Sequence, residues 1–536
     1  MRDGVLLRGD LYRPMAEAAY PLLLWRTIFR KDTLSRAFGP YDPAYFVRRG
    51  YAVFIQDARG LGASDGEFDR FTADGTDGYD TIEWLAAQPF CNGQIGMIGN
   101  YYAGYLQLMA AAENPPHLRA ICPMQTSVSI NRDCDNRGFL FASHIGWCMS
   151  RLISRLRDGR YDAQTTQVYL PRLLKAIQDY PISQLSALPL AEMPILQDTP
   201  FPILRDYFAH LVEGYDDFDL IHKEGRDMDM GAIQTPAFYL CGWYDSARTP
   251  LLDHCRAQRL KGVDSRVLIA PWKPGEAPAR ADHALETGEV AVDIQREMVE
   301  WFDHWLKGAD APGWPAVRYY DIAGGEAFSG EMWPADGDAL GTLYLQADGA
   351  LRAGPPKDDA ASDMYLHDPM KPLPFLGYGR AAGQPFAAPY ALYYAAPPVT
   401  LPIMINGLVR AEVYLSSDAR DADVMMRLYD VAPDGSRFSV CDGATRARYR
   451  NGWQSEPLEP GEVYAVQIAL GHLRFTLPAG HRLLLEISGS AFPKYDVNHG
   501  TAERPAHDAK QVLSHNRVHR ESAHASRLVL PLRIRA

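Results

Sequence analysis

The feature that most limits the fold of this chain is the alternation of short apolar runs with helical patterns in its first third. Apolar runs of strand length cover residues 20–25, 51–56, 95–98 and 118–124, and residues 79–89 carry apolar side chains at helical spacing. Strands that alternate with helices indicate βαβ units and a parallel sheet. In such sheets the active residues gather at the carboxyl ends of the strands.

The middle of the chain has a different pattern. From residue 128 to 231 it is helical, with segments such as YLPRLLKAIQDY and FPILRDYFAHLVEGY and no run typical of a strand. Strand patterns return in TPAFYLCGWYD and SRVLIAPW, and the long amphipathic segment VAVDIQREMVEWFDHWLKG follows them. We therefore interpret residues 128–231 as a helical cap inserted into an α/β domain that consists of residues 1–127 and 232–311.

The last part of the chain, residues 312–536, is rich in proline and glycine and contains many short alternating segments. Examples are VRAEVYLSSD, DVMMRLYDV, VYAVQIAL, HRLLLEIS and SRLVLPL. This spacing favours an all-β sandwich or jelly roll. A chain of 536 residues is also too long for a single core.

Composition excludes several classes of function. The net charge is −12 and no basic stripe is present, which argues against nucleic-acid binding. No apolar run reaches the length of a membrane span. The N-terminal MRDGVLLRGDLYRP is too charged for a signal peptide, and the seven cysteines form no metal-binding spacing. We expect a cytoplasmic protein with a small-molecule substrate, no metal and no cofactor; self-association through the β domain stays open.

The segment GMIGNYYAGY, residues 96–105, concentrates the functional question. It indicates a buried strand, a sharp turn, and a helix that begins at Ala103. This is the layout of a nucleophile elbow, in which a serine occupies the strained turn between two glycines. Here the residue between Gly99 and Gly104 at that position is Tyr101.

Several segments together resemble the cocaine esterase-like CocE/NonD hydrolases, which are related to X-Pro dipeptidyl peptidases. They include YAVFIQDARGLGASDGEF, GMIGNYYAGY, GWYDSARTP, WFDHWLKG, CDGATRARYR and SGSAFPKYDVN, in the order of the family and over nearly the whole chain. The resemblance implies an α/β-hydrolase domain, a helical cap and a C-terminal jelly roll. It also implies a bacterial protein, with secondary metabolism as a setting by analogy.

The resemblance further implies a Ser-His-Asp triad, which this sequence does not supply in full. The serine position holds Tyr101, the acid position holds Asp245 in GWYDS, and the histidine position in PWKP holds Pro274. The tyrosine that donates to the oxyanion falls on Phe29 in RTIFRK, which has no hydroxyl, whereas Tyr102 still offers its backbone N–H. Hydrolysis by the mechanism of the family is therefore not expected.

Two interpretations of Tyr101 remain open. A large ring could plug a decayed site, or the elbow could present a phenol for proton transfer. A decayed site would accept glycine or alanine at lower cost, which favours the second interpretation. A phenol has a reference pKa near 10 and donates a proton without help. Acting as a base would require nearby cations, for which Lys31, Arg26 and Lys273, on loops after strands, are the candidates.

The remaining candidates support the site from other segments. Asp245 either caps the following turn or serves as a general base whose pKa is raised by burial. His283 could replace the missing base from a long loop, and His144 could line the pocket from the cap. Trp243, in the phrase that contains Asp245, is expected to support the substrate.

Three functions are consistent with these residues. The first is a non-hydrolytic enzyme that uses Tyr101, with Asp245, for elimination, isomerisation or cyclisation of a small acyl, amide or polyketide-like molecule. The second is an ester or amide hydrolase with a rearranged site built from Asp245 or His283. The third is a non-catalytic binding protein whose pocket is plugged by Tyr101.

Overall fold

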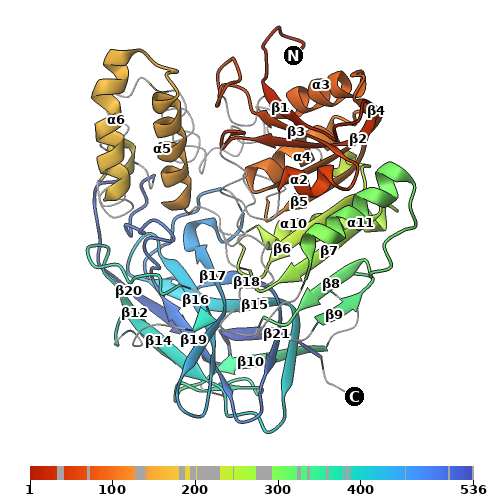
Figure 1. The fold of residues 1–536 in the computed structure, drawn as a ribbon. Coiled ribbons are helices and arrows are strands. Elements are labelled where there is room, and N and C mark those ends of the chain that lie inside the picture. Colours follow the sequence, from red (N-terminus) through yellow and green to blue (C-terminus); the bar gives the residue numbers. More distant parts are fainter. Residues whose placement is uncertain are drawn as a thin grey trace. The chain divides into compact units, whose positions relative to one another are not determined.

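The chain folds into two compact units. In the computed structural model they consist of Met1–Cys134 with Gly225–Asp336, and of Asp135–Glu224 with Gly337–Ala536 (Figure 1). The structure describes residues 1–32, 42–68, 73–126, 139, 142–179, 188–193, 201, 230–245, 247–272, 292–322, 327–334, 339–357, 361–377, 379–380, 386, 388–452, 454–504 and 507–533, with backbone alone at 142–145, 339, 380 and 533.

The first unit is built on a nine-stranded sheet in the order β1-β3-β2-β4-β5-β6-β7-β8-β9. Neighbouring strands from β3 to β8 are parallel, whereas β1 and β9 are antiparallel edge strands. The strands are β1 (Gly9–Tyr12), β2 (Tyr20–Thr27), β3 (Ala52–Asp57), β4 (Cys91–Asn100), β5 (Leu118–Met124), β6 (Ala237–Gly242), β7 (Ser265–Ala270), β8 (Val317–Tyr320) and β9 (Ala327–Gly330).

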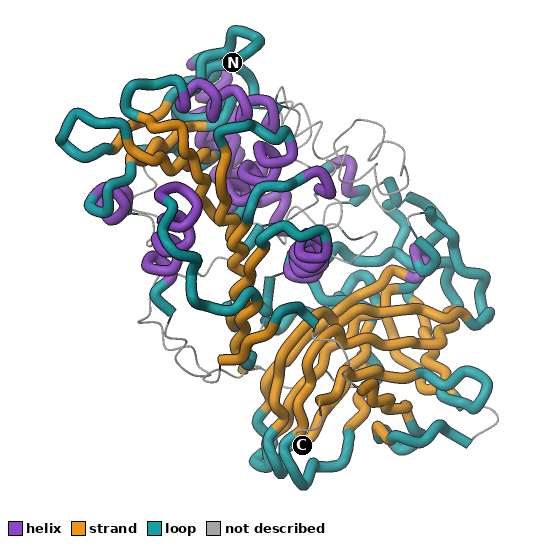
Figure 2. The backbone as a smooth tube through the Cα atoms, turned by 90° about the vertical axis from the view of Figure 1, so that its right-hand side faces the viewer, coloured by secondary structure: helices purple, strands orange, loops and turns teal. Residues whose placement is uncertain are grey.

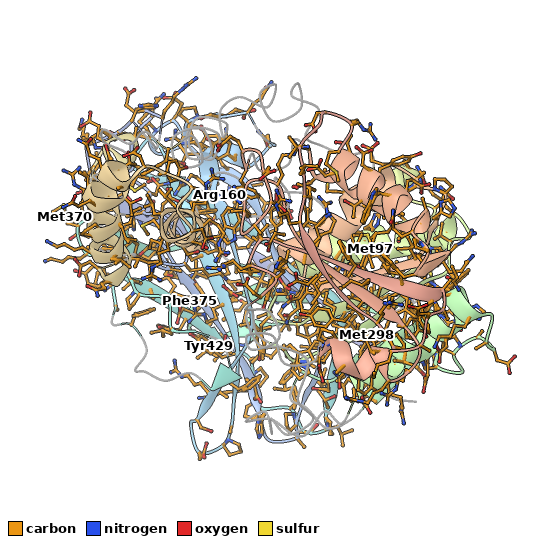
Figure 3. All side chains as sticks on the ribbon, turned by 45° about the horizontal axis from the view of Figure 1, so that its top comes forward. Met97, Arg160, Met298, Met370, Phe375 and Tyr429 are labelled. Atoms are coloured by element: carbon orange, nitrogen blue, oxygen red, sulfur yellow. The ribbon has the colours of Figure 1, made fainter. Side chains whose placement is uncertain are left out.

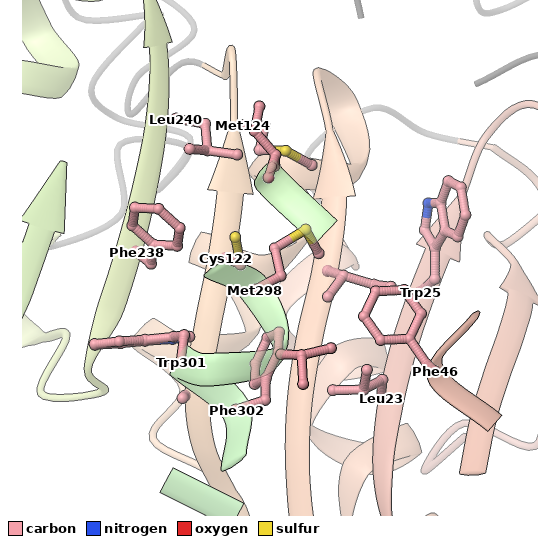
Figure 4. Packing of buried hydrophobic residues seen from close by; sticks show 14 of the residues in the cluster. Leu23, Trp25, Phe46, Cys122, Met124, Phe238, Leu240, Met298, Trp301 and Phe302 are labelled. Atoms are coloured by element: carbon pink, nitrogen blue, oxygen red, sulfur yellow. The ribbon is translucent and has the colours of Figure 1, made fainter. Parts of the chain in front are cut away.

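Helices lie on both sides of this sheet, as Figure 2 shows. They are α2 (Pro43–Val47), α3 (Asp74–Ala86), α4 (Tyr102–Ala112), α10 (Arg248–Leu260) and α11 (Ile294–Lys307), with a short 3₁₀ helix, η2, at Met230–Ala232. The apolar face of α11 presents Met298, Trp301 and Phe302 to the sheet residues Leu23 and Cys122 (Figure 4). This amphipathic packing is the core of the unit on that face.

Glycines permit the close approach of helices in this unit. A Cβ atom on Gly96 of β4 would lie 2.5 Å from the Phe302 ring, so the ring of α11 occupies the space that a side chain would need. Met97, the next residue of β4, points to the opposite face because side chains alternate along a strand (Figure 3). A Cβ atom on Gly78 of α3 would lie 2.6 Å from Cβ of Ala110, which brings α3 against α4.

The second unit combines helices with two antiparallel sheets. Its helices are α5 (Ala142–Arg157), α6 (Ala163–Gln178) and the 3₁₀ helices η1 (Leu190–Glu192) and η3 (Ala447–Tyr449). The seven-stranded sheet has the order β11-β10-β21-β15-β20-β12, with β18 also paired to β15. It consists of β10 (Ala339–Leu345), β11 (Leu351–Arg352), β12 (Ser362–His367), β15 (Ile403–Ser417), β18 (Tyr464–Leu477), β20 (Ser514–His519) and β21 (Arg527–Arg533).

The five-stranded sheet of this unit has the order β13-β17-β16-β19-β14. Its strands are β13 (Gly379–Arg380), β14 (Ala391–Ala395), β16 (Asp423–Val431), β17 (Arg437–Arg446) and β19 (Arg482–Ser488). Charged groups are buried beside it: the Arg446 guanidinium, 1% exposed, pairs with the carboxylates of Asp423 at 2.9 Å and Asp496 at 3.1 Å. The ring of Phe139 lies over the same guanidinium, 4.6 Å away.

The sequence pattern predicted this architecture, with differences at element boundaries. The parallel sheet and the β-rich C-terminal jelly roll are confirmed, and α5 and α6 are helices as expected for the cap. The sheet of the first unit continues beyond residue 311, the predicted end of the α/β domain. Here β8 pairs with β7, and Arg318 of β8 binds Glu297 of α11 at 2.5 Å. The helix expected at residues 79–89 begins earlier, at Asp74, and of the segment FPILRDYFAHLVEGY only Phe201 belongs to the described residues.

Candidate active site

Tyr101 occupies the turn between β4 and α4 in a backbone conformation that side chains rarely adopt. Its φ is 52° and its ψ is −122°, and α4 begins at the next residue. Such a conformation costs about 1–3 kcal/mol and persists only where the surrounding structure enforces it. The structure therefore places a strained residue at the position that the sequence pattern identifies as the elbow.

Two glycines make room for this turn, as the motif requires. A Cβ atom on Gly99, whose φ is 144°, would lie 2.7 Å from Cβ of Ala103 in the first turn of α4. A Cβ atom on Gly104 would lie 2.7 Å from Cβ of Thr126, which follows β5. Side chains at either position would push the helix away from the strand ends, so the sharp turn at Tyr101 depends on both glycines.

Backbone and side-chain hydrogen bonds from the end of β5 hold the elbow. The Tyr101 N–H donates to the Met124 carbonyl oxygen at 2.9 Å, and the Thr126 hydroxyl donates to the Tyr101 carbonyl oxygen at 2.8 Å. Gln125 lies between these two partners and also has a positive φ, 40°; Arg30, after β2, has a φ of 68°. Sequence reasoning missed Gln125 and the backbone of Arg30, because a positive φ at a residue other than glycine leaves no sequence signal. It missed Thr126 because its contact with Tyr101 joins residues 25 positions apart.

The sheet order places the elbow at its topological switch point. Strand β2 lies between β3 and β4, so the chain leaves the carboxyl ends of β2 and β4 toward opposite sides of the sheet. Ligands of open α/β sheets bind in the crevice outside the carboxyl ends at such a point. Tyr101 follows β4 and Phe29 follows β2, so both residues lie at this edge of the switch point.

The register of the sheet brings Asp245 to the same edge. Asn100, Met124, Leu240 and Leu268 form a continuous row of paired residues across β4, β5, β6 and β7. Asp245 follows β6 beyond this row, as Tyr101 follows β4. Because β4 and β6 flank β5, two strand spacings, about 10 Å, separate the two strand ends.

Asp245 is buried at the start of α10 with one oxygen engaged. Its Oδ1 accepts a hydrogen bond from the Ala247 N–H at 3.0 Å, and the Arg248 guanidinium donates to its backbone carbonyl at 3.0 Å. Its Oδ2 is buried and has no hydrogen-bond partner among the residues that the structure describes. Burial raises the pKa of Asp245, against the opposing effects of the Ala247 N–H and the Arg248 charge. Both interpretations of this residue, the cap of a turn and a carboxylate with a raised pKa, match its surroundings.

Phe29 and Lys31 lie after β2 with different surroundings. The Phe29 ring is half-buried and packs against the core cluster on the α11 side of the sheet. The Lys31 ammonium lies 2.9 Å from the Asp10 carboxylate, and the hydrogen bond to Asp10 raises the pKa of Lys31. The Lys31 N–H donates to Asp57 at 2.7 Å. The charge of Lys31 is therefore directed to Asp10.

Tyr102 is the first residue of α4, and its side chain links the start of this helix to the start of α3. Its hydroxyl donates to Oδ2 of Asp74 at 2.6 Å, and the Arg26 guanidinium donates to the Asp74 backbone carbonyl at 2.7 Å. Arg26 is 1% exposed and lies inside β2, so our expectation of a loop cation beside the pocket was wrong for this residue. It instead ties β2 to the start of α3.

Among the other predicted residues, the structure describes the side chain of Trp243 alone. Trp243 is 1% exposed, its indole N–H donates to the Tyr320 carbonyl at 2.7 Å, and its ring contacts Trp333. It thus supports the end of β6 from the side of β8. Lys273 and His283, together with Pro274, lie outside the described residues, and so does the side chain of His144.

The chain matches known families over most of its length. The model of the X-Pro dipeptidyl-peptidase (S15 family) matches residues 3–273, and that of the X-Pro dipeptidyl-peptidase C-terminal non-catalytic domain matches residues 312–529. The cocaine esterase of Rhodococcus sp. (strain MB1 Bresler) is 32% identical, over 99% of this chain and 97% of that protein. This chain belongs to the X-Pro dipeptidyl-peptidase S15 family.

Solved structures of the same architecture agree with this assignment. An α-amino acid ester hydrolase has a TM-score of 0.81 at 23% identity, covering 99% of this chain and 95% of its own. An aminopeptidase from a Thaumarchaeota archaeon has a TM-score of 0.80 at 22% identity, with the same coverage. A CocE/NonD family hydrolase from Staphylococcus aureus has a TM-score of 0.73 at 17% identity, covering 99% of this chain and 92% of its own. At these identities the likeness concerns the fold, and it confirms the predicted α/β-hydrolase and β-rich domains.

Metal-binding clusters and membrane-spanning helices can be assessed among the described residues. Within the described ranges, no group of three or more histidine, cysteine, aspartate or glutamate side chains is arranged to hold a metal ion. None of the helices in those ranges combines the length and apolar character needed to cross a membrane.

Proposed function

We propose that this S15-family protein is a non-hydrolytic enzyme in which Tyr101 donates a proton to a small acyl, amide or polyketide-like substrate. Elimination, isomerisation and cyclisation suit such a site, because none of these reactions needs a covalent serine intermediate. The observation that carries the proposal is a tyrosine in the strained elbow, at φ 52° and ψ −122°.

The strain of the elbow supports a functional side chain at this position. A site that had only lost its serine would relax at lower cost with glycine, which adopts a positive φ freely. Tyr101 instead keeps a bulky side chain there, on a backbone whose N–H donates to the Met124 carbonyl and whose carbonyl accepts from the Thr126 hydroxyl. The N-terminus of α4 directly follows, and its positive dipole end stabilises negative charge that develops on the phenol oxygen or on the substrate.

The residues at the family's catalytic positions argue against serine hydrolysis. Tyr101, Phe29 and Pro274 stand where the resemblance places the serine, the oxyanion tyrosine and the histidine. Loss of a triad costs on the order of 10⁶ in rate, roughly 8 kcal/mol of barrier. Loss of one oxyanion donor costs roughly a further 3 kcal/mol. The mechanism of the family would therefore give no useful rate in this chain.

Asp245 supplies the complementary group in this proposal. Its buried Oδ2, without a partner among the described residues, is positioned at the same sheet edge as Tyr101. A carboxylate whose pKa is raised by burial is a better proton acceptor than an exposed one. Tyr101 as the acid and Asp245 as the base would together move a proton from one atom of the substrate to another.

Proton exchange tests this function without knowledge of the natural substrate. We expect the full-length protein to catalyse exchange of the α-protons of small β-ketoesters and acyl amides in D₂O, followed by NMR. Tyr101→Phe removes only the hydroxyl and should lower the exchange rate about 10²-fold or more. Tyr105→Phe, in the first turn of the α4 helix that follows the elbow, is the matched control and should keep the rate. Unchanged exchange in Tyr101→Phe would refute proton transfer by this hydroxyl.

A second function, hydrolysis by a water that Asp245 or His283 activates, is favoured by one observation. Asp245 keeps a buried oxygen free of described partners, and the chain is 32% identical to a cocaine esterase. Under this alternative, turnover of activated esters falls in Asp245→Asn and persists in Tyr101→Phe. Tyr101→Ser alone should not create hydrolysis, because the residue at position 274 is proline. A protein that binds acyl compounds but catalyses neither reaction would be the binding protein of the third interpretation.

A further inference from the structure

A second group of nucleophilic and basic side chains lies in the C-terminal β unit, on strands β15 and β20. The Ser416 hydroxyl oxygen lies 2.9 Å from Nε2 of His519. The other ring nitrogen of His519, Nδ1, lies 3.3 Å from Oε1 of Glu521. Nucleophile, imidazole and carboxylate therefore follow one another through the two ring nitrogens in the order that an acyl-transfer triad requires.

The carboxylate selects the tautomer that activates the serine. When Nδ1 carries the proton and donates it to Glu521, Nε2 has a lone pair and accepts the hydrogen bond from the Ser416 hydroxyl. His524 also contacts the same Oε1 of Glu521, through its Nδ1 at 2.8 Å. The His519 carbonyl accepts a hydrogen bond from the Ser526 hydroxyl at 2.6 Å, which holds the backbone of the histidine.

The side chains of Ser416, His519 and Glu521 are mostly shielded from solvent. The side chain of Glu521 is 10% exposed and that of His519 is 16% exposed, whereas His524 is 39% exposed. Ser416 is 4% exposed. Burial lowers the pKa of His519, against the opposing effect of Glu521, so the imidazole is neutral and can accept a proton at neutral pH. A serine that is only 4% exposed admits a small acyl group more readily than a polypeptide, which suits a small ester better than a peptide.

A cation stands next to the serine on the same face of the sheet. In the register of β15 and β20, Ser416 is directly opposite Arg517, and Tyr414 is directly opposite His519. Directly opposed residues have Cβ atoms about 5 Å apart on one face. Along β20, Arg517 is exposed whereas its neighbours Asn516 and Val518 are buried, so the side chain of Arg517 reaches solvent from the face on which Ser416 is buried. A guanidinium there can stabilise the negative oxygen that forms when the serine attacks.

We propose that Ser416, His519 and Glu521 form a second acyl-transfer site, which hydrolyses small esters with the Arg517 guanidinium as the oxyanion partner. Oγ of Ser416 bonds to the acyl carbon while its proton passes to Nε2 of His519. The ester C–O bond breaks, and the leaving alcohol takes that proton. Water then attacks the acyl-serine by the same route and releases the acid. This site does not depend on the function proposed for Tyr101.

A fluorophosphonate probe on the full-length protein tests the proposal, with peptide mass spectrometry to locate the adduct. We expect an adduct on Ser416 and its loss in His519→Gln, which lacks the base. Ser417→Ala, the adjacent serine on the opposite face of the strand, is the matched control and should keep the adduct. Slow hydrolysis of 4-nitrophenyl acetate should fall about 10²-fold in Ser416→Ala and stay unchanged in Ser417→Ala.

Two outcomes would overturn this proposal. One is the absence of an adduct on Ser416 in a sample that was treated with the probe and is still folded. The melting temperature of that sample, equal to that of an untreated one, shows that it is folded. The other is equal labelling of the wild type and of His519→Gln, which would show that the histidine does not activate the serine. Arg517→Gln gives an independent readout: an oxyanion role lowers kcat for the ester, whereas a purely structural role lowers the melting temperature and leaves kcat unchanged.

Discussion

The strained backbone of Tyr101 leads to a prediction about stability that is independent of any substrate. At φ 52° and ψ −122° a residue with a Cβ atom is under strain, whereas glycine is not. Replacing the tyrosine by alanine removes the ring and keeps the strain; replacing it by glycine removes both. The difference between Tyr101→Gly and Tyr101→Ala therefore reports the strain, offset by the greater freedom of glycine in the unfolded chain, because the loss of the ring is common to both variants.

The magnitude follows from two opposing contributions. Relief of the strain stabilises the folded state by about 1–3 kcal/mol. The greater freedom of glycine in the unfolded chain costs about 0.5–1 kcal/mol. We expect Tyr101→Gly to exceed Tyr101→Ala in free energy of unfolding by about 1 kcal/mol. In a unit of about 250 residues this corresponds to a melting temperature that is higher by about 2–4 °C.

Differential scanning calorimetry of the full chain measures this difference. The readout is the melting temperature of the first unit, compared between Tyr101→Gly and Tyr101→Ala. Ala257→Gly, at an exposed interior position of α10 in the same unit, is the matched control. It should lower the free energy of unfolding by about 0.5–1 kcal/mol, the opposite sign. If Tyr101→Gly melted below Tyr101→Ala, the elbow would hold no strain, and the argument for a retained functional side chain would lose its basis.

Three further predictions concern other parts of the two units. Gly104→Ala places a Cβ atom 2.7 Å from Cβ of Thr126 and should cost about 1–3 kcal/mol in denaturant unfolding; an unchanged midpoint would contradict the close packing. Burial lowers the pKa of His254 from 6.5 to about 4, so the folded state binds fewer protons than the unfolded one. Stability should therefore fall by about 3 kcal/mol as the pH drops from 6.5 to 4, and His254→Gln should flatten this dependence. Arg446→Met leaves the buried carboxylates of Asp423 and Asp496 without their cation and should cost about 3–5 kcal/mol; a loss below 1 kcal/mol would contradict the ion-pair account.

Much of the fold could be predicted because its signals are local. The run LRAICPM coincides with β5, and DVMMRLYDV coincides with β16, because buried strands need continuous or alternating apolar residues. The elbow was recognisable from the spacing of Gly99, the turn residue and Gly104. Arg26 shows where local reasoning failed: an arginine near a strand end is usually exposed, but here a carbonyl of α3 accepts its hydrogen bond inside the sheet.

The sequence by itself determined the order of strands and helices, the position of the elbow and the identity of Tyr101 and Asp245. Short-range periodicity and glycine spacing carry this information, because they act between residues close in the chain. Only the tertiary structure decided which residues hold the elbow and which side chains of β15 and β20 contact each other. Thr126 contacts Tyr101 across 25 positions, and Ser416 contacts His519 across 103. Such contacts depend on sheet order and register, which are set by packing of the whole unit and leave no pattern within either segment.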